Sequence, residues 1–313
     1  STGRRDAAAS GTGTSAVLMG GTTSPGPVAN TEEWTGAGAP VGAWSTGGDL
    51  NDSRNAPGGA GTSNTASLAF GGSSPPYTGN TELYNGSSWT ETANMNTARE
   101  THASMGTSTA ALASGGFGGN SPPYGIKDVT ETWNGSTWTE VADLNTGRSY
   151  TAGAGSTTAA LVFSGYKPGG STGITESFNG STWTEVADLG QARSVGAGGG
   201  TQTSAIMMAG ELDPGAMPAR TELWTGSSWT ESGDMNTGRK ALAESTTDIT
   251  SSLAFGGRNP PTVYANTEDW DGVSWSEVAD LNNGRYAIGG SGVETSGLAF
   301  GGLDPSRSAA TEE

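Results

Sequence analysis

The stretch TETWNGSTWTEVADLNTGR, residues 130–148, returns almost unchanged as TESFNGSTWTEVADLGQAR at residues 175–193. The Thr-Glu pair that opens both stretches recurs in the same phase at Thr31, Thr81, Thr130, Thr175, Thr221, Thr267 and Thr311. Successive pairs lie 44 to 50 residues apart. A period of this length is typical of proteins built from repeated supersecondary units. The chain is therefore predicted to consist of seven related units.

Two other markers keep the same period. An arginine recurs at Arg4, Arg54, Arg99, Arg148, Arg193, Arg239 and Arg285. Each of the first six units also carries an aromatic pair, whose second member is Trp44, Trp89, Trp138, Trp183, Trp229 or Trp275. The predicted units are residues 4–53, 54–98, 99–147, 148–192, 193–238, 239–284 and, incomplete, 285–313.

Each unit is predicted to form four short strands. Alternation and turn residues place one after the arginine, one at an apolar run such as SLAFGG (residues 67–72), one at TETWN and one at STWTEVADL. Asn134-Gly135 separates the last two, and Asn-Gly readily supplies the positive φ of a tight hairpin. The Asn-Gly-Ser sequons at Asn85, Asn134 and Asn179 are interpreted as such turns.

A single four-stranded meander cannot bury both of its faces, so neighbouring units must stack. Radial stacking leaves only short strand edges exposed. Residue size agrees with wedge-shaped blades, because first strands such as RSVGAGGG (residues 193–200) are small and the later strands carry the aromatic pair. We expect a single-domain, all-β, seven-bladed β-propeller of four-stranded antiparallel blades, with the Trp rings wedged between blades at the periphery.

The order of arginine, small strand, apolar strand ending in Gly-Gly, acidic-plus-aromatic strand, turn and Trp resembles the kelch repeat of β-propellers along the whole chain. Ser164-Gly165 and Ala209-Gly210 depart from the double glycine, and the first aromatic residue varies among Trp, Tyr and Phe. The wording NGSSWTE, LNTGR and LAFGG is also similar to kelch-like repeats in tail-fibre and structural proteins of marine bacteriophages. That resemblance implies a place on a virion or an extracellular surface.

The fourth strand is found in only six units, because the seventh stops at Thr311-Glu312-Glu313. The last blade is expected to lack its outer strand within this chain. An unpaired edge favours strand addition, so a neighbouring subunit or residues outside this segment are expected to complete the blade. The start, STGRRDAAAS, has neither Met nor a signal-peptide core, which predicts a segment of a longer chain.

Composition argues against several classes of protein. A net charge of −17 and a pI near 4.3 disfavour nucleic acid and anionic membranes as partners. No apolar run reaches membrane-spanning length. The absence of Cys excludes disulfides and thiolate chemistry, so a metal site would need oxygen ligands. The charge and an apolar fraction of 32% would suit a disordered chain, but ten regularly spaced Trp argue against disorder.

No catalytic constellation is apparent. His102 is the only histidine, is expected within a first strand, and has no GxSxG motif nearby. A copper oxidase site of the kelch type would need a Cys-Tyr crosslink and paired histidines. A two-carboxylate glycosidase stays open because acidic residues are numerous, whereas one arginine per unit does not match the arginine cluster of sialidases. We therefore expect no enzymatic activity.

The periodic charges allow two interpretations each. The arginines could form an anion-binding ring, but pairing with the recurring glutamates is favoured because it would join blades. These are Glu32, Glu82, Glu131, Glu176, Glu222, Glu268 and Glu312. Periodic aspartates either cap turns, which is favoured, or bind calcium, for which no EF-hand-like loop is present. These are Asp49, Asp143, Asp188, Asp234 and Asp280. No cofactor is expected.

The loops after the Gly-Gly positions vary freely and are expected on the same face as the ADLNTGR connections. Loops on a rigid scaffold commonly carry recognition. Candidate ligand-binding residues are Tyr77, Phe117, Tyr124, Lys127, Tyr166, Lys167, Asp213, Arg258, Tyr264 and Asp304. A glycan is a reasonable ligand, because aromatic rings can pack on sugar C–H groups and the polar side chains can hydrogen-bond sugar hydroxyls. The alternative is that the loop Tyr and Pro residues only stabilise the loops locally.

These observations favour a structural or adhesive propeller of a virion fibre or extracellular appendage, with appendage proteins and a host-surface glycan or a partner protein as its partners. A carbohydrate-active hydrolase or lyase that uses loop carboxylates or tyrosines is the first alternative. A protein–protein adaptor is the second.

Overall fold

The computed structural model describes residues 77–286 continuously except for Gly86 and Pro123. Outside that range it describes residues 8–12, 15–19, 26, 31–35, 44–46, 50–52, 58–63, 66–73, 289–293, 296–300, 303–304, 306–307 and 311–312. All regular structure in these residues is β-strand. None of them forms a helix that could cross a membrane.

Seven of the antiparallel sheets in the described residues are large and are here called blades 1 to 7 in chain order; the other sheets are small and consist of two-residue strands. Blade 1 contains β1 (Ala8–Thr12), β2 (Ser15–Met19), β3 (Thr31–Thr35) and β4 (Trp44–Thr46). Blade 2 contains β5 (Gly58–Ser63), β6 (Ala66–Phe70), β7 (Thr81–Tyr84) and β8 (Trp89–Glu91). Blade 3 contains β10 (Ala103–Thr107), β11 (Ala110–Ser114), β14 (Thr130–Trp133) and β15 (Trp138–Glu140). Blade 4 contains β16 (Ala152–Gly155), β17 (Ala160–Phe163), β20 (Thr175–Phe178) and β21 (Trp183–Glu185).

The remaining blades follow the same order. Blade 5 contains β22 (Ala197–Thr201), β23 (Ser204–Met208), β24 (Thr221–Trp224) and β25 (Trp229–Glu231). Blade 6 contains β26 (Ala243–Asp248), β27 (Ser251–Phe255), β30 (Thr267–Trp270) and β31 (Trp275–Glu277). Blade 7 contains β32 (Gly289–Val293), β33 (Ser296–Phe300) and β36 (Thr311–Glu312), and within the described residues it has no fourth strand.

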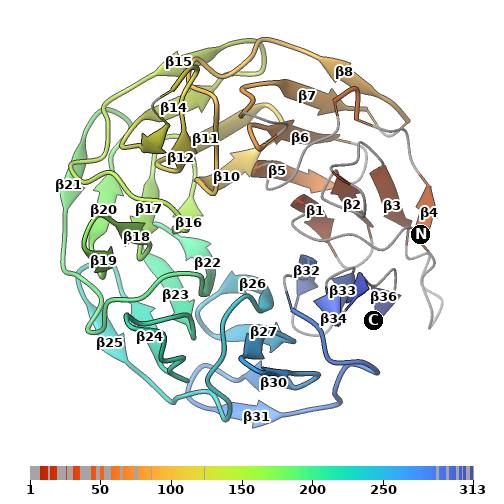
Figure 1. Ribbon diagram of the computed structural model, residues 1–313, viewed down its shortest axis with the longest axis vertical. Helices are drawn as coiled ribbons and strands as arrows, with labels where there is room; N and C mark the ends of the chain where they lie inside the picture. The colour runs from red at the N-terminus through yellow and green to blue at the C-terminus, as the bar shows by residue number, and fades with distance from the viewer. Residues whose placement is uncertain are drawn as a thin grey trace.

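The blades are arranged radially around one centre (Figure 1). The first strand of every blade is innermost, and β4, β8, β15, β21, β25 and β31 lie at the periphery (Figure 1). The circle is closed, because β32 of blade 7 contacts both β26 of blade 6 and β1 of blade 1. The chain is therefore an all-β, seven-bladed propeller, as the sequence predicts, and its last blade has three strands in the described part.

Small residues allow the inner strands to approach the centre. Gly153 of β16 pairs with Val162. A Cβ at Gly153 would lie 2.5 Å from the Met105 side chain of the neighbouring blade. Bulkier residues follow outward: Trp133 of β14 pairs directly with Trp138 of β15, and their ring centroids lie 5.7 Å apart. The gradient of residue size thus matches the wedge shape of each blade.

The hydrophobic core lies between the blades. Leu68 and Phe70 of blade 2 form one buried cluster with Ala111, Trp133 and Trp138 of blade 3. The Trp138 ring packs on the Phe70 ring at a centroid distance of 4.9 Å. Interblade packing of the peripheral Trp rings is thereby confirmed where the structure describes it. The side chain of Trp44 lies outside the described residues.

Two features of the fold differ from the sequence expectations. His102 lies just before β10 rather than within it, because Thr101 adopts a left-handed φ of 53° that interrupts the extended backbone. The variable loops contain short strands that carry no periodic signal: β12 (Phe117–Gly118), β13 (Gly125–Ile126), β18 (Tyr166–Lys167), β19 (Gly170–Ser171), β28 (Arg258–Asn259), β29 (Thr262–Val263), β34 (Leu303–Asp304) and β35 (Ser306–Arg307). A further short strand, β9 (Arg99–Glu100), begins at the periodic arginine and pairs with β12.

Candidate ligand-binding face

The variable loops and the ADLNTGR connections meet on one face of the propeller, called the variable face below. Leu144 of such a connection donates its backbone N–H to the carbonyl of Asp128 in a variable loop at 3.0 Å. Met95 binds Gly79 in the same way at 2.8 Å, and Leu281 binds Ala265 at 3.0 Å. The predicted placement of these two kinds of segment on one face is therefore confirmed in blades 2, 3 and 6.

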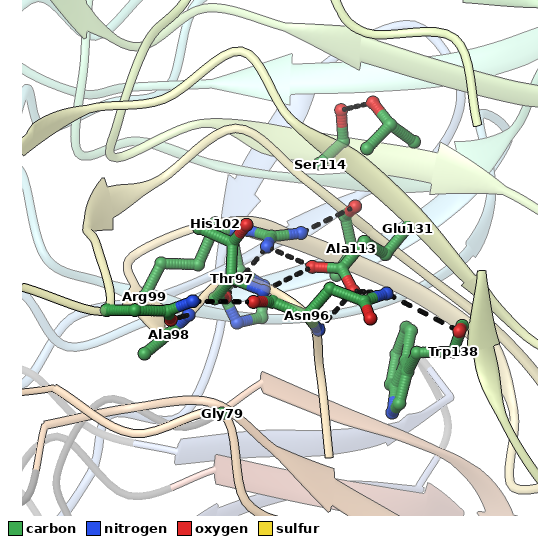
Figure 2. Close-up of polar contacts among 12 residues, drawn as sticks. Gly79, Asn96, Thr97, Ala98, Arg99, His102, Ala113, Ser114, Glu131 and Trp138 are labelled. Carbon is green, nitrogen blue, oxygen red and sulfur yellow. Dashed lines mark hydrogen bonds and ion pairs between the residues drawn. The ribbon is translucent and has the colours of Figure 1, made fainter. Parts of the chain in front are cut away.

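A set of hydrogen bonds between an arginine, a glutamate and an asparagine, called the latch below, recurs under this face; Figure 2 shows the one formed by Arg99, Glu131 and Asn96. The Nη1 of Arg99 donates to Glu131 Oε1 at 2.5 Å, and its Nη2 donates to the carbonyl of Ala113 at 3.2 Å. The other carboxylate oxygen, Oε2, accepts from the backbone N–H and the side-chain amide of Asn96 at 2.6 and 2.8 Å. Because Asn96 follows the outer strand of blade 2, the latch ties blade 2 to blade 3.

The same ion pair recurs in later blades. Its other members are Arg148–Glu176 at 2.6 Å, Arg193–Glu222 at 2.6 Å, and Arg239–Glu268. The guanidinium side chains of these pairs are fully buried. Burial lowers the pKa of Arg99, Arg148 and Arg193, while the glutamate charge opposes that shift.

The predicted pairing of arginine with glutamate is confirmed for these four arginines. Their burial excludes them from an exposed anion-binding ring. Arg285 is also fully buried. Arg54 lies outside the described residues.

Three of the periodic aspartates cap the third strand of their blades, while Asp49 lies outside the described residues. Asp143, Asp188 and Asp280 each accept a hydrogen bond from the backbone N–H of Thr130, Thr175 and Thr267, at 3.0 to 3.1 Å. In blade 2, Asn94 replaces the aspartate and accepts from Thr81 at 3.2 Å. Within the described residues, no group of three or more His, Asp or Glu side chains could hold a metal ion. Capping, the favoured interpretation, is therefore what these three aspartates do.

The variable face displays changing side chains on a constant backbone. In each described case, the residue after the periodic arginine pairs with the residue after the double-glycine position. The pairs are Glu100↔Phe117, Ser149↔Tyr166, Ser194↔Glu211 and Lys240↔Arg258. The side chains of these pairs range from acidic and aromatic to basic, although the backbone pairing is shared. Such a surface can change its chemistry without changing its fold.

The residue that follows each of these pairs along the first segment is held in a strained backbone conformation. Thr101, Tyr150, Val195 and Ala241 have φ values in the left-handed region, at 53°, 54°, 56° and 53° respectively. Tyr150 donates its N–H to the carbonyl of Thr101 at 3.0 Å, and Ala241 donates to Val195 at 3.2 Å. These bonds join neighbouring blades next to the inner strands, so the strain belongs to the architecture of the repeat.

Three predicted candidates come together as an aromatic cluster formed by Tyr77, Phe117 and Tyr124. The Tyr77 ring lies 5.8 Å from Phe117 at an interplanar angle of 69°, and 4.8 Å from Tyr124 at 73°. Tyr77 comes from a loop of blade 2, whereas the other two come from blade 3. The three side chains are only partly buried, so part of each ring is accessible to solvent.

Glu100 and Tyr150, which were not among the predicted candidates, lie beside this cluster. Glu100 is the direct cross-strand partner of Phe117. Burial raises the pKa of Tyr77, and the charges of Glu100, Tyr124 and Tyr150 add to that rise. Tyr150 is 51% exposed, the most exposed tyrosine of the described part. Glu100 directly follows Arg99, and Tyr150 lies two residues after Arg148. The units differ at these positions, and that variability was the available signal.

The other candidates are spread around the face. Tyr166 is 41% exposed on β18, beside a half-buried Lys167. Lys127 follows β13, and its ammonium lies near the backbone of Gly119. Tyr264 is half-buried, and its carbonyl accepts from the N–H of Arg285 at 3.0 Å.

Asp213 and Arg258 differ in what they contact. Asp213 accepts a hydrogen bond from the backbone N–H of Ser171 in the preceding blade, so it braces two loops. Arg258 lies with its guanidinium carbon 4.1 Å from the centre of the Tyr286 ring. The backbone of Asp304 belongs to β34, and its side chain lies outside the described residues.

His102 is part of the interblade packing. It is 8% exposed and stacks on Phe70 at a centroid distance of 5.4 Å. Its Nδ1 lies 3.0 Å from the Ser104 hydroxyl, and burial, together with the charge of Arg99, lowers its pKa to about 3. A buried, neutral imidazole stacked on a core ring serves packing rather than acid–base chemistry at the surface.

Comparison with known proteins identifies the fold. No protein-family model matches the chain, and no curated protein matches it. A solved structure described as "Structure of YjhT" superposes with a TM-score of 0.67 at 14% sequence identity, covering 86% of this chain and 95% of that one. YjhT is a kelch-repeat β-propeller. Identity this low shows the fold alone, and that fold is the kelch-type β-propeller.

Proposed function

We propose that this propeller is a non-enzymatic binding scaffold of a virion fibre or an extracellular appendage, and that its variable face binds a glycan on a host surface. The observation that carries the proposal is the aromatic cluster of Tyr77, Phe117 and Tyr124. Three rings from two blades converge on the face where the side chains vary most.

The geometry of the cluster suits a sugar. Aromatic rings offer an apolar surface to sugar C–H groups, and the perpendicular arrangement of Tyr77 and Tyr124 provides two such surfaces at an angle. Tyrosine hydroxyls can hydrogen-bond sugar hydroxyls at the rim of the same surface. The exposed ring of Tyr150 extends this surface toward the next blade.

Rigidity supports a binding role. Every described latch places a buried ion pair beneath the variable face, and Asn96 and Asn145 link the connections to it at 2.6 Å from Glu131 and Glu176. A binding surface that is already ordered loses less conformational entropy when a ligand binds. The loops can therefore differ in sequence while they remain fixed in space.

The proposed location on a virion or appendage rests on a resemblance of short sequence segments and not on the fold. The segments NGSSWTE, LNTGR and LAFGG of this chain resemble kelch-like repeats of marine bacteriophage fibre proteins. The net charge of −17 disfavours contact with nucleic acid, which is also negatively charged. Immunogold labelling of intact virions or appendages with an antibody against the propeller tests this part directly, and label found only on cytoplasmic material would contradict it.

A glycan array tests the binding function. We expect Tyr77→Ala and Tyr124→Ala each to reduce binding of the selected glycan at least tenfold. Val273→Ala is the matched control, because Val273 is 73% exposed in a hairpin on the opposite face. Unchanged binding by both tyrosine variants, with unchanged thermal unfolding, would exclude the cluster. Release of shortened sugar products would instead favour the hydrolase or lyase alternative, and capture of a protein with no glycan binding would favour the adaptor.

A further inference from the structure

Arg258 and Lys240 form a cationic position on the variable face. Arg258 donates its backbone N–H to the carbonyl of Lys240 at 2.9 Å, and Lys240 returns the same bond at 2.9 Å. Directly paired residues in antiparallel strands carry their side chains on the same side of the sheet. Of the four described pairs at this place in the repeat, this is the one in which both residues are basic.

The two cations differ in their partners. The Lys240 ammonium binds Glu211 Oε2 at 2.7 Å. Among the described residues, no carboxylate forms an ion pair with Arg258. Its Nε is buried without a hydrogen-bond partner, as are the Nε atoms of Arg99, Arg148, Arg193 and Arg239, so the missing ion pair is what distinguishes Arg258. The side chain of Arg258 stacks on the ring of Tyr286 instead. Arg99, Arg148, Arg193 and Arg239, in contrast, each hold a glutamate.

A shortage of acidic residues does not explain why no carboxylate of the described residues pairs with Arg258. The chain has 31 acidic residues against 14 Lys and Arg. A partly buried cation is costly unless an anion compensates it. Stacking on Tyr286 fixes the plane of the guanidinium, while its terminal nitrogens remain for in-plane hydrogen bonds.

We propose that Arg258 anchors an anion subsite, which binds a carboxylate, sulfate or phosphate group of the ligand. The planar guanidinium matches two oxygens of such a group through parallel N–H···O bonds. Lys240 adds positive potential beside it even though Glu211 pairs with its ammonium. This inference deepens the proposed function, since it makes the ligand an acidic glycan with a negative group at blade 6.

The test follows the Arg258 Nε–Hε signal of ¹⁵N-labelled protein by NMR. The probes are sodium D-glucuronate, inorganic sulfate, inorganic phosphate and, as a neutral control, D-glucose. We expect the three anions to shift this signal in a saturable way and D-glucose to leave it unchanged. The order of the three affinities tells which oxyanion the subsite prefers, and each order that excludes D-glucose supports the proposal.

Variants separate charge from geometry. We expect Arg258→Gln to abolish anion binding in calorimetric titration, and Arg258→Lys to weaken it at least tenfold because lysine keeps the charge but lacks the planar fork. Arg220→Gln is the matched control, because Arg220 already pairs with Glu222 at 3.3 Å and with Glu231 at 2.7 Å. Its affinity for the anions should equal that of the wild type.

Two results would overturn the proposal: no shift of the Arg258 signal with any anion, or equal anion affinity in Arg258→Gln. The wild-type titration decides the matter even if a variant fails to fold. If a glycan array shows binding of neutral glycans that Arg258→Gln leaves unchanged, the anion subsite is wrong while the proposed function stands. If no glycan binds but sulfate still shifts the Arg258 signal, the subsite stands and the glycan proposal is wrong.

Discussion

Trp138 donates its indole N–H to the hydroxyl of Thr81, across the boundary between blades 3 and 2, at a distance of 2.8 Å. The same bond joins Trp229 to Thr175 and Trp275 to Thr221, each at 2.8 Å. Each of these three Trp residues therefore contributes both its ring and a directional bond to the neighbouring blade. Trp183 differs from them, because its Nε1 is buried without a partner.

This exception gives a matched pair of variants. The acceptor expected for the Trp183 indole is Thr130 Oγ1 of blade 3, which lies 2.8 Å from the hydroxyl of Ser114. Blade 2 has Phe70 at the position of Ser114, so no hydroxyl lies there beside Thr81. Trp138→Phe should lower the free energy of unfolding by about 1–2 kcal/mol more than Trp183→Phe, because only Trp138 loses a buried hydrogen bond. Urea denaturation measures both values. Equal losses would show that the indole N–H bond adds nothing beyond ring packing.

The latch should be a strong stabilising contact. Glu131→Gln leaves the buried Arg99 cation without its counter-charge, and breaking a buried ion pair in this way costs about 3–5 kcal/mol. The control is Glu231→Gln, because Glu231 is 51% exposed in its pair with Arg220. Exposed pairs contribute about 0–1 kcal/mol. Thermal unfolding followed by circular dichroism compares the two, and similar melting temperatures would contradict the assigned role of the latch.

Ser164 occupies a position that favours glycine. Its φ is 61°, and Gly71, Gly115 and Gly256 have values of 62° to 71° at the same place, namely 64°, 71° and 62°. The Ser164 hydroxyl is also buried without a partner. Ser164→Gly should therefore stabilise the protein by about 1–3 kcal/mol, since it removes both left-handed strain and an unsatisfied hydroxyl.

The reverse change provides the control for Ser164→Gly. A Cβ at Gly115 would lie 2.6 Å from the carbonyl oxygen of Arg148. Gly115→Ser should accordingly destabilise the fold in the same urea titration. If both variants changed stability in the same direction, the backbone would not be the cause.

Burial of His102 should make stability depend on pH. Its pKa falls from 6.5 to about 3 on folding, so between these values the unfolded chain binds a proton that the folded chain does not. Stability contributed by the neutral imidazole is complete above pH 6.5 and decreases as the pH falls toward 3. The slope for one proton is at most about 1.4 kcal/mol per pH unit.

The variant His102→Leu isolates this contribution. Leu242 occupies the corresponding place in blade 6 and is 8% exposed there, so the repeat accommodates leucine. We expect the difference in unfolding free energy between wild type and His102→Leu to change with pH below 6.5 and to be constant above it. A difference that is flat from pH 4 to 8 would show that His102 is not shielded from protonation.

Much of the fold could be predicted from particular residues. The period of Thr-Glu, the Arg phase and the paired aromatic residues located the strands, because each unit repeats the same local pattern. The pairing of Arg99 with Glu131 was also predictable, since two opposite charges locked to one period must meet in every unit. Two-residue strands such as β12 and β13 were missed because a period cannot be recognised over two residues.

The candidate site was less predictable. Tyr77 and Phe117 lie 40 positions apart in units that differ in loop length, and nothing local indicates that their rings meet. Asp213 was selected as a ligand-binding residue, but it binds the backbone of Ser171 in the preceding blade. Glu100 and Tyr150 were not predicted, because the sequence does not show that residues one or two positions after a repeated arginine lie next to the aromatic side chains of the variable loops.

The amino-acid sequence alone determined the number of blades, the order of strands within each and the face that carries the variable loops, because these properties depend on a local pattern repeated seven times. Only the tertiary structure decided which side chains of different units touch. Closure of the ring places the loops of neighbouring blades side by side, and the resulting contacts, such as Tyr77 with Tyr124 or Arg258 with Tyr286, depend on distances that no single unit encodes.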